Sequence, residues 1–162
     1  MTPQPGDAIL YPASGKSAWS SRIVAAGEIL AGFGDGIEQY SHAAVLSDKP
    51  GLQWEATFPF IGEYKIDTSR TYEIWRLGDL TTLERLKVLD WCRSKKGHLY
   101  NLIGVLSFGY LRLPDTYFCS QFLGEAYGQV GRKVGDKIMS PDSIPDYPGA
   151  VMIGRYSPGG PS

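Results

Sequence analysis

The strongest structural signal in this sequence is a pair of short strand-like runs joined by a turn. The runs are residues 41–46 (SHAAVL) and 52–57 (LQWEAT), and between them lies the segment Asp48-Lys49-Pro50-Gly51. Proline and glycine in the middle of such a connection are typical of a tight turn. The sequence therefore predicts an antiparallel hairpin in which positions near residue 44 lie opposite residue 55.

Other apolar runs predict the remaining elements. Strands are expected at residues 7–11, 71–77 and 150–153, where short apolar or β-branched runs end at turn residues. Helices are expected at residues 23–32 (capped by Ser20 or Ser21), 82–97 and 120–130, and a short helix or an ordered loop at residues 102–110. The order β-α-β-β-β-α-α-β predicts an α+β fold with helices packed on an antiparallel sheet.

Composition narrows the class of protein. The 162 residues suit one domain, spanning residues 1–162, with a single core. The net charge of −1 provides no basic field for nucleic acid. No apolar run approaches the roughly 18 residues of a membrane span, and the first residues lack a secretory signal. We therefore expect neither nucleic acid nor a membrane segment, and a protein that is cytoplasmic or travels with a virion.

The two cysteines, Cys92 and Cys119, are too few for a disulfide framework, and we expect two free thiols. Cys92 falls within the second predicted helix, on or beside a face formed by Leu83, Leu86 and Leu89, and is assigned to the core.

Cys119 lies where a loop is expected to turn into a helix. The unpaired N–H groups and the positive end of the helix dipole favour the thiolate, which is the nucleophilic form. The alternative is that Cys119 is simply a small buried apolar residue.

Two further side chains complete a candidate constellation with Cys119. His42 begins a strand, and Glu55 is expected across the hairpin from it, where a carboxylate orients an imidazole that takes the thiol proton. A structural histidine and a solvent-facing glutamate are the alternatives. His98 follows Gly97 at a helix end, where it is expected to contact free carbonyls.

The spacing of His42, Glu55 and Cys119 fits no compact metal motif, so no metal or cofactor is expected.

At these residues the sequence resembles a known family. Residues 97–101 (GHLYN) and 117–123 (YFCSQFL) are similar to the cysteine-containing core of NlpC/P60 peptidases. The histidine-containing part, with residues 6–7 (GD), 40–45 (YSHAAV) and 55–56 (EA), precedes the cysteine. This order resembles the circularly permuted branch, which includes YiiX-like proteins and lecithin retinol acyltransferase relatives.

The resemblance implies a papain-like fold with Cys119 as nucleophile, His42 as base and Glu55 orienting the histidine. It also implies that Tyr100 and Ser120 lie near the substrate or the oxyanion. Two features depart from the family: many relatives carry a histidine or another polar group at the Glu55 position, and the Gly-Gly pair of unpermuted members is missing.

The expected activity is cleavage of an amide bond in a small peptide of peptidoglycan origin, through an acyl-enzyme. One alternative is a lipid acyltransferase or thioesterase of the same fold, which should show an apolar anchor. Another is an inactive papain-like module kept for binding or for building a virion.

Overall fold

The computed structural model of the chain describes residues 1–13, 40–106, 113–134, 141–158 and 160–161. Its strands form one sheet in the order β4-β3-β2-β1-β5-β6-β7, and every neighbouring pair is antiparallel. The strands are β1 (Ala8–Pro12), β2 (Tyr40–Leu46), β3 (Leu52–Ala56), β4 (Ile61–Lys65), β5 (Tyr72–Leu77), β6 (Ala150–Ser157) and β7 (Gly160–Pro161).

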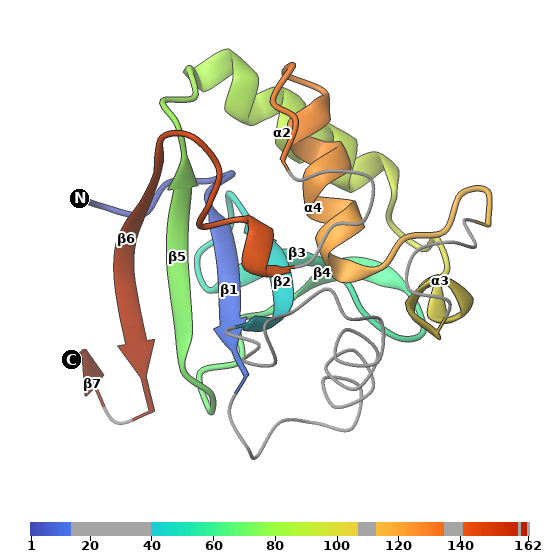
Figure 1. Cartoon of the computed structure of the whole chain (residues 1–162), viewed down its shortest axis with the longest axis horizontal. Coiled ribbons are helices and arrows are strands. Elements are labelled where there is room, and N and C mark those ends of the chain that lie inside the picture. The colour runs from blue at the N-terminus through green and yellow to red at the C-terminus, as the bar shows by residue number, and fades with distance from the viewer. Residues whose placement is uncertain (14–39, 107–112, 135–140, 159, 162) are drawn as a thin grey trace.

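The helices within the described residues are α2 (Thr82–Ser94), α3 (Leu102–Leu106), α4 (Cys119–Gly128) and the short 3-10 helix η1 (Pro141–Ser143). Helices α2 and α4 lie next to each other, and α4 packs on β2 and β3 (Figure 1). The predicted α+β arrangement, with helices packed on an antiparallel sheet, is confirmed. The helix predicted at residues 23–32 falls outside the described residues, and of residues 102–110 only the first part is described. No helix of the described segments has both the length and the apolar character needed to cross a membrane.

The hairpin between β2 and β3 forms with the predicted register. Val45 pairs with Trp54 and Leu46 with Gln53, so one further step along the ladder places residue 44 opposite residue 55. Gly51 closes the turn with a φ of 73°, a conformation that glycine adopts without steric cost. This register places Glu55 diagonally across from His42 on one face of the sheet.

The sequence analysis missed strand β4, which pairs with β3 along its whole length. Its segment contains Gly62 and polar residues, which weaken the strand signal. The structure gives the glycine a reason, because a Cβ atom built on Gly62 would lie 2.8 Å from the ring of Tyr64. Gly62 therefore lets the Tyr64 ring lie flat against the strand.

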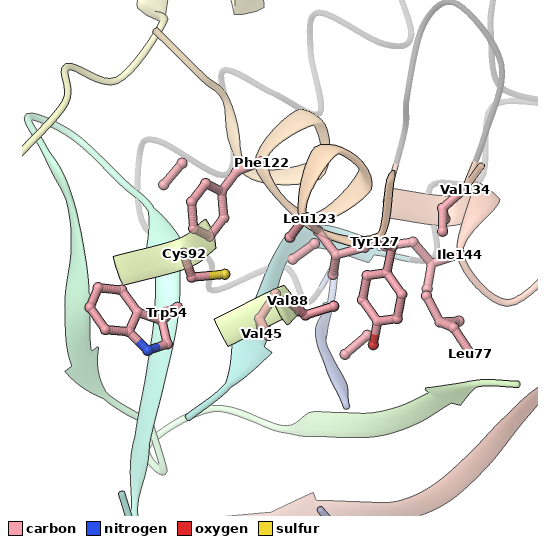
Figure 2. Packing of buried hydrophobic residues seen from close by; sticks show 14 of the residues in the cluster. Val45, Trp54, Leu77, Val88, Cys92, Phe122, Leu123, Tyr127, Val134 and Ile144 are labelled. Carbon is pink, nitrogen blue, oxygen red and sulfur yellow. The ribbon is translucent and has the colours of Figure 1, made fainter. Parts of the chain in front are cut away.

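The larger hydrophobic core lies between the sheet and helices α2 and α4 (Figure 2). The sheet contributes Val45 and Trp54, and α4 contributes Phe122, all of which are almost fully buried. Cys92 of α2 is 0% exposed and lies among these side chains, as predicted. A smaller cluster on the opposite face of the sheet contains Ile9, Tyr11, Ala44 and Ile74.

The predicted apolar face of α2 is partly wrong. Leu83 and Leu86 are 62% and 48% exposed, whereas the buried apolar residues of this helix are Val88, Leu89 and Cys92. Arg85 lies on the core-facing side, one turn before Val88 and Leu89, and its Nη1 donates to Asp7 Oδ1 at 3.0 Å. The first half of the helix is therefore held by an ion pair rather than by leucines. A capping box between Thr81 and Glu84 starts the helix.

The Gly6-Asp7 pair has a structural role. Asp7 is 1% exposed and accepts hydrogen bonds from Arg76 at 2.8 and 3.1 Å, in addition to the bond from Arg85. The hydroxyl of Tyr127 in α4 donates to the carbonyl of Gly6. These contacts join the start of β1 to α2, β5 and α4, so the pair fixes the helices on the sheet that carries His42.

Candidate active site

The His42 and Glu55 side chains meet across the β2–β3 ladder. His42 Nε2 lies 2.5 Å from Glu55 Oε2, and the two side chains are only 16% and 13% exposed. Because a carboxylate accepts hydrogen bonds, this contact places the proton on Nε2. Nδ1 is then the ring nitrogen that remains for another partner.

That partner is Cys119, whose thiol forms a hydrogen bond with the His42 side chain. Cys119 is the first residue of α4, and its side chain is 1% exposed. Phe118, the preceding N-cap residue, makes no side-chain capping bond. The positive end of the helix dipole is therefore close to the sulfur atom, as predicted.

The pKa of His42 reflects these two neighbours. Burial alone would lower it, but the hydrogen bonds that the ring donates to Cys119 and to Glu55, together with the charge of Glu55, outweigh burial and raise the pKa from 6.5 to about 10. The imidazole is therefore protonated at neutral pH.

Tyr100 lies close enough to Cys119 for the two groups to interact electrostatically. It forms a parallel bridge with Tyr117, two residues before Cys119. Its pKa is raised, first by burial and then by the negative charge of Cys119. The phenol therefore keeps its proton at neutral pH and remains able to donate a hydrogen bond. Ser120, the next residue of α4, is 1% exposed, and its role in substrate binding stays a prediction.

The other cysteine and histidine behave as expected from the sequence. Cys92 and Cys119 are both free thiols, and burial raises the pKa of Cys92. Nδ1 of His98 lies 2.9 Å from the carbonyl oxygen of Lys95 at the end of α2. Neither Cys92 nor His98 belongs to the group around Cys119.

The sequence analysis missed two polar residues behind Glu55. Gln53 Nε2 donates to Glu55 Oε2 at 3.1 Å, and the hydroxyl of Tyr11 donates to Gln53 Oε1 at 2.8 Å. Both side chains are buried, at 2% and 1% exposure. Strand alternation puts Gln53 on the same face as Glu55, which was the available signal, but nothing local in the sequence points to Tyr11.

Exposed apolar side chains adjoin the site on the Glu55 face of the sheet. Residues 60, 62 and 64 share the side of β4 that faces the same way as Glu55, because Gly62 is the register partner of Glu55. Phe60 is 47% exposed, and its bridge partner Leu99 is 56% exposed. Tyr64 donates its hydroxyl to the Phe60 carbonyl at 2.9 Å and is close enough to Glu55 to feel its charge.

No protein-family model matches the chain, and no curated protein matches it either. In the part of the chain that the structure describes, no three or more His, Cys, Asp or Glu side chains are grouped so as to hold a metal ion.

Proposed function

We propose that this protein is a cysteine hydrolase that cleaves an amide bond in a small peptide, with Cys119 as nucleophile, His42 as acid and base, and Glu55 orienting His42. The observation that carries the proposal is that the His42 ring contacts both Cys119 and Glu55, so that the three side chains form one series of contacts. A nucleophile, a base and an orienting carboxylate in this order are what acyl transfer requires.

In the first half of the reaction, the Cys119 thiolate attacks the carbonyl carbon, and the carbonyl π electrons move onto its oxygen. The backbone N–H of Cys119 at the start of α4 and the protonated phenol of Tyr100 are the proposed donors to this oxyanion. When the intermediate collapses, the C–N bond breaks and the His42 imidazolium donates its proton to the leaving amine. The products are a thioester on Cys119, a free amine and a neutral His42.

In the second half, neutral His42 removes a proton from a water molecule, whose oxygen attacks the thioester carbonyl. The C–S bond then breaks, the carboxylic acid leaves, and Cys119 and His42 return to the thiolate–imidazolium pair. Glu55 stabilises the imidazolium in both halves, because its carboxylate lies on the opposite nitrogen of the ring.

The fold is proposed to be papain-like and circularly permuted, because the histidine strand precedes the cysteine helix in the chain. The resemblance to permuted NlpC/P60 proteins supports a peptide substrate of peptidoglycan origin, taken up in the cytoplasm or met at the cell wall by a virion. An antiparallel sheet with the cysteine helix packed on it is consistent with that fold.

The proposal is tested by the reactivity of the two thiols. Wild-type protein is treated with iodoacetamide at neutral pH, and labelling of Cys119 and Cys92 is followed by peptide mass mapping. Cys119 should react faster than glutathione under the same conditions, and Cys92 should not react in the folded protein. Synthetic muropeptides are then incubated with wild type and with Cys119→Ala. The wild type should hydrolyse them and the variant should not. Alkylation of Cys119 no faster than that of glutathione would leave an inactive binding module as the better description.

A second candidate function is supported by the exposed apolar side chains beside the site. Phe60 and Leu99, which are 47% and 56% exposed, offer the apolar surface that a lipid acyltransferase or thioesterase would need. In that case kcat/KM for p-nitrophenyl esters should rise from acetate through butyrate to octanoate, and Leu99→Ser should flatten the series. A flat series in the wild type, together with cleavage of peptides, would favour the peptidase.

A further inference from the structure

Two residues that contact neither the nucleophile nor the proposed substrate lie behind Glu55 in an ordered chain of hydrogen bonds. We propose that Gln53 and Tyr11 are positioning residues for the reaction: they hold the Glu55 carboxylate ionised and aimed at His42. This inference rests on the proposed function, since it concerns how the orienting carboxylate is kept in its working state.

The chain of hydrogen bonds has a single direction. The backbone N–H of Asp67 donates to the Tyr11 oxygen at 3.3 Å, and the Tyr11 hydroxyl donates to Gln53 Oε1 at 2.8 Å. Gln53 Nε2 then donates to Glu55 Oε2 at 3.1 Å. Because the Tyr11 oxygen already accepts from the backbone, its own proton is directed to the Gln53 carbonyl.

This direction determines which end of the Gln53 amide faces Glu55. The carbonyl end is occupied by the Tyr11 hydroxyl, so the NH₂ end must face the carboxylate. Burial raises the pKa of Tyr11 to about 12, so the phenol stays a donor over the working pH range. Without Tyr11 the amide is free to turn, and its oxygen would then face the carboxylate of Glu55 and repel it.

The hydrogen bonds from Gln53 and from His42 are both accepted by the same oxygen atom of Glu55. Glu55 Oε2 receives both the His42 Nε2–H and the Gln53 Nε2–H, at 2.5 and 3.1 Å. A second donor on that oxygen stabilises the ionised carboxylate and opposes transfer of the imidazole proton to it. It also restricts the rotation of the Glu55 side chain, which keeps Oε2 in line with the imidazole.

Several charged and titratable groups surround the hydrogen-bonded series of Tyr11, Gln53 and Glu55. Glu55 is faced by His42, Gln53, Tyr11 and Tyr64. Tyr11 is faced by His42, Tyr72, Asp67 and Arg70, whose guanidinium carbon lies 5.0 Å from the centre of the Tyr11 ring. Among the described residues, Gln53 is the one neutral side chain that donates to the Glu55 carboxylate, so its removal changes the hydrogen bonding there without changing the net charge.

The test compares the pH dependence of kcat/KM in wild type, four single variants and one double variant. Gln53→Met removes the donor but keeps an unbranched side chain of similar length, and Gln53→Glu places a second carboxylate against Glu55. Tyr11→Phe removes only the hydroxyl, and Tyr72→Phe is the matched control, because Tyr72 contacts the Tyr11 ring. Loss of a hydrogen bond to a charged group should lower kcat/KM roughly tenfold in Gln53→Met.

The pH profile separates a positioning role from a merely structural one. The acid limb should move to higher pH in Gln53→Met, and further in Gln53→Glu, because two carboxylates in contact share a proton. Tyr11→Phe should shift the limb in the same direction by less, and the double variant Tyr11→Phe/Gln53→Met should match Gln53→Met alone. An acid limb that stays at the wild-type pH in both Gln53 variants overturns the proposal, whatever happens to the rate.

A second measurement does not need turnover. The proton between Glu55 and His42 should give a downfield imidazole signal in the NMR spectrum, which is lost at acid pH when Glu55 takes up a proton. The pH of that loss should rise in Gln53→Glu and stay at the wild-type value in Tyr72→Phe. This result tests the chain of hydrogen bonds even in a protein whose Cys119 proves unreactive, so failure of the proposed function and failure of this inference give different results.

Discussion

Replacing Glu55 with glutamine removes the negative charge beside the His42 ring while keeping the shape of the side chain. The glutamine oxygen still accepts the Nε2 hydrogen bond, but it no longer balances the charge of the imidazolium. In the wild type, Nε2 and Oε2 are 2.5 Å apart and the pKa of His42 is raised to about 10 against the effect of burial. The substitution should therefore lower the pKa of His42.

The size of the effect follows from the separation and burial of the pair. An opposite charge this close shifts a pKa by about 1 to 3 units, which corresponds to about 1.5 to 4 kcal/mol in favour of the imidazolium. Because the pKa of His42 is raised, the protonated ring stabilises the folded state. This contribution is fully present below pH 6.5 and is lost as the pH rises through about 10. In Glu55→Gln this loss should occur at lower pH, and the thiolate–imidazolium pair should persist over a narrower range.

The assay is an NMR titration of the imidazole carbon-bound protons from acid to alkaline pH. The chain has two histidines, so the spectrum is simple, and His42→Gln assigns the signals. His98 serves as the internal control, because its Nδ1 contacts a backbone carbonyl rather than Glu55. An unchanged His42 midpoint in Glu55→Gln, with the His98 midpoint also unchanged, would refute the electrostatic role assigned to Glu55.

Three other substitutions test the remaining assignments. Cys119→Ala should abolish peptide hydrolysis while circular dichroism shows an intact fold, and a residual wild-type rate would contradict the nucleophile assignment. Cys92→Ala should lower the free energy of unfolding in urea by about 1–2 kcal/mol because it leaves a small cavity, with hydrolysis nearly unchanged. Asp7→Asn should cost about 3 kcal/mol in the same denaturation assay, because it leaves the Arg76 and Arg85 guanidinium groups without their buried anion. If Asp7→Asn leaves the free energy of unfolding unchanged within experimental error, water replaces the carboxylate.

The half of the candidate site formed by the hairpin could be predicted from the sequence. His42 and Glu55 are thirteen residues apart and are joined by a turn that fixes their register. Alternation then places them on one face of the sheet, which is a local consequence of strand geometry. The start of α4 at Cys119 and the capping of α2 by Thr81 are local signals of the same kind.

Strand β4 and the buried face of α2 could not be predicted from such local signals in the sequence. In the sequence Gly62 indicates a break in the strand, but in the structure the Tyr64 ring occupies the space where a Cβ atom of residue 62 would lie. Leu83 and Leu86 look like core residues until Arg85 is found on the inward side of the helix, paired with Asp7 just before the first strand. In α2 a partner far away in the chain changed what the pattern meant, whereas in β4 the reason for the glycine is a side chain two residues away in the same strand, whose position only the folded strand shows.

The sequence by itself determined the hairpin, the α+β character and the two histidines and two cysteines available for chemistry. Only the tertiary structure brought the Cys119 thiol to the His42 ring and placed Tyr11 behind Gln53, 42 residues away in the chain. The physical reason is that periodicity, caps and turns act over a few residues, whereas these contacts depend on how the whole core packs. Helix α4 reaches His42 because Phe122, Leu123 and Tyr127 bury it against the sheet, and no short pattern encodes that placement.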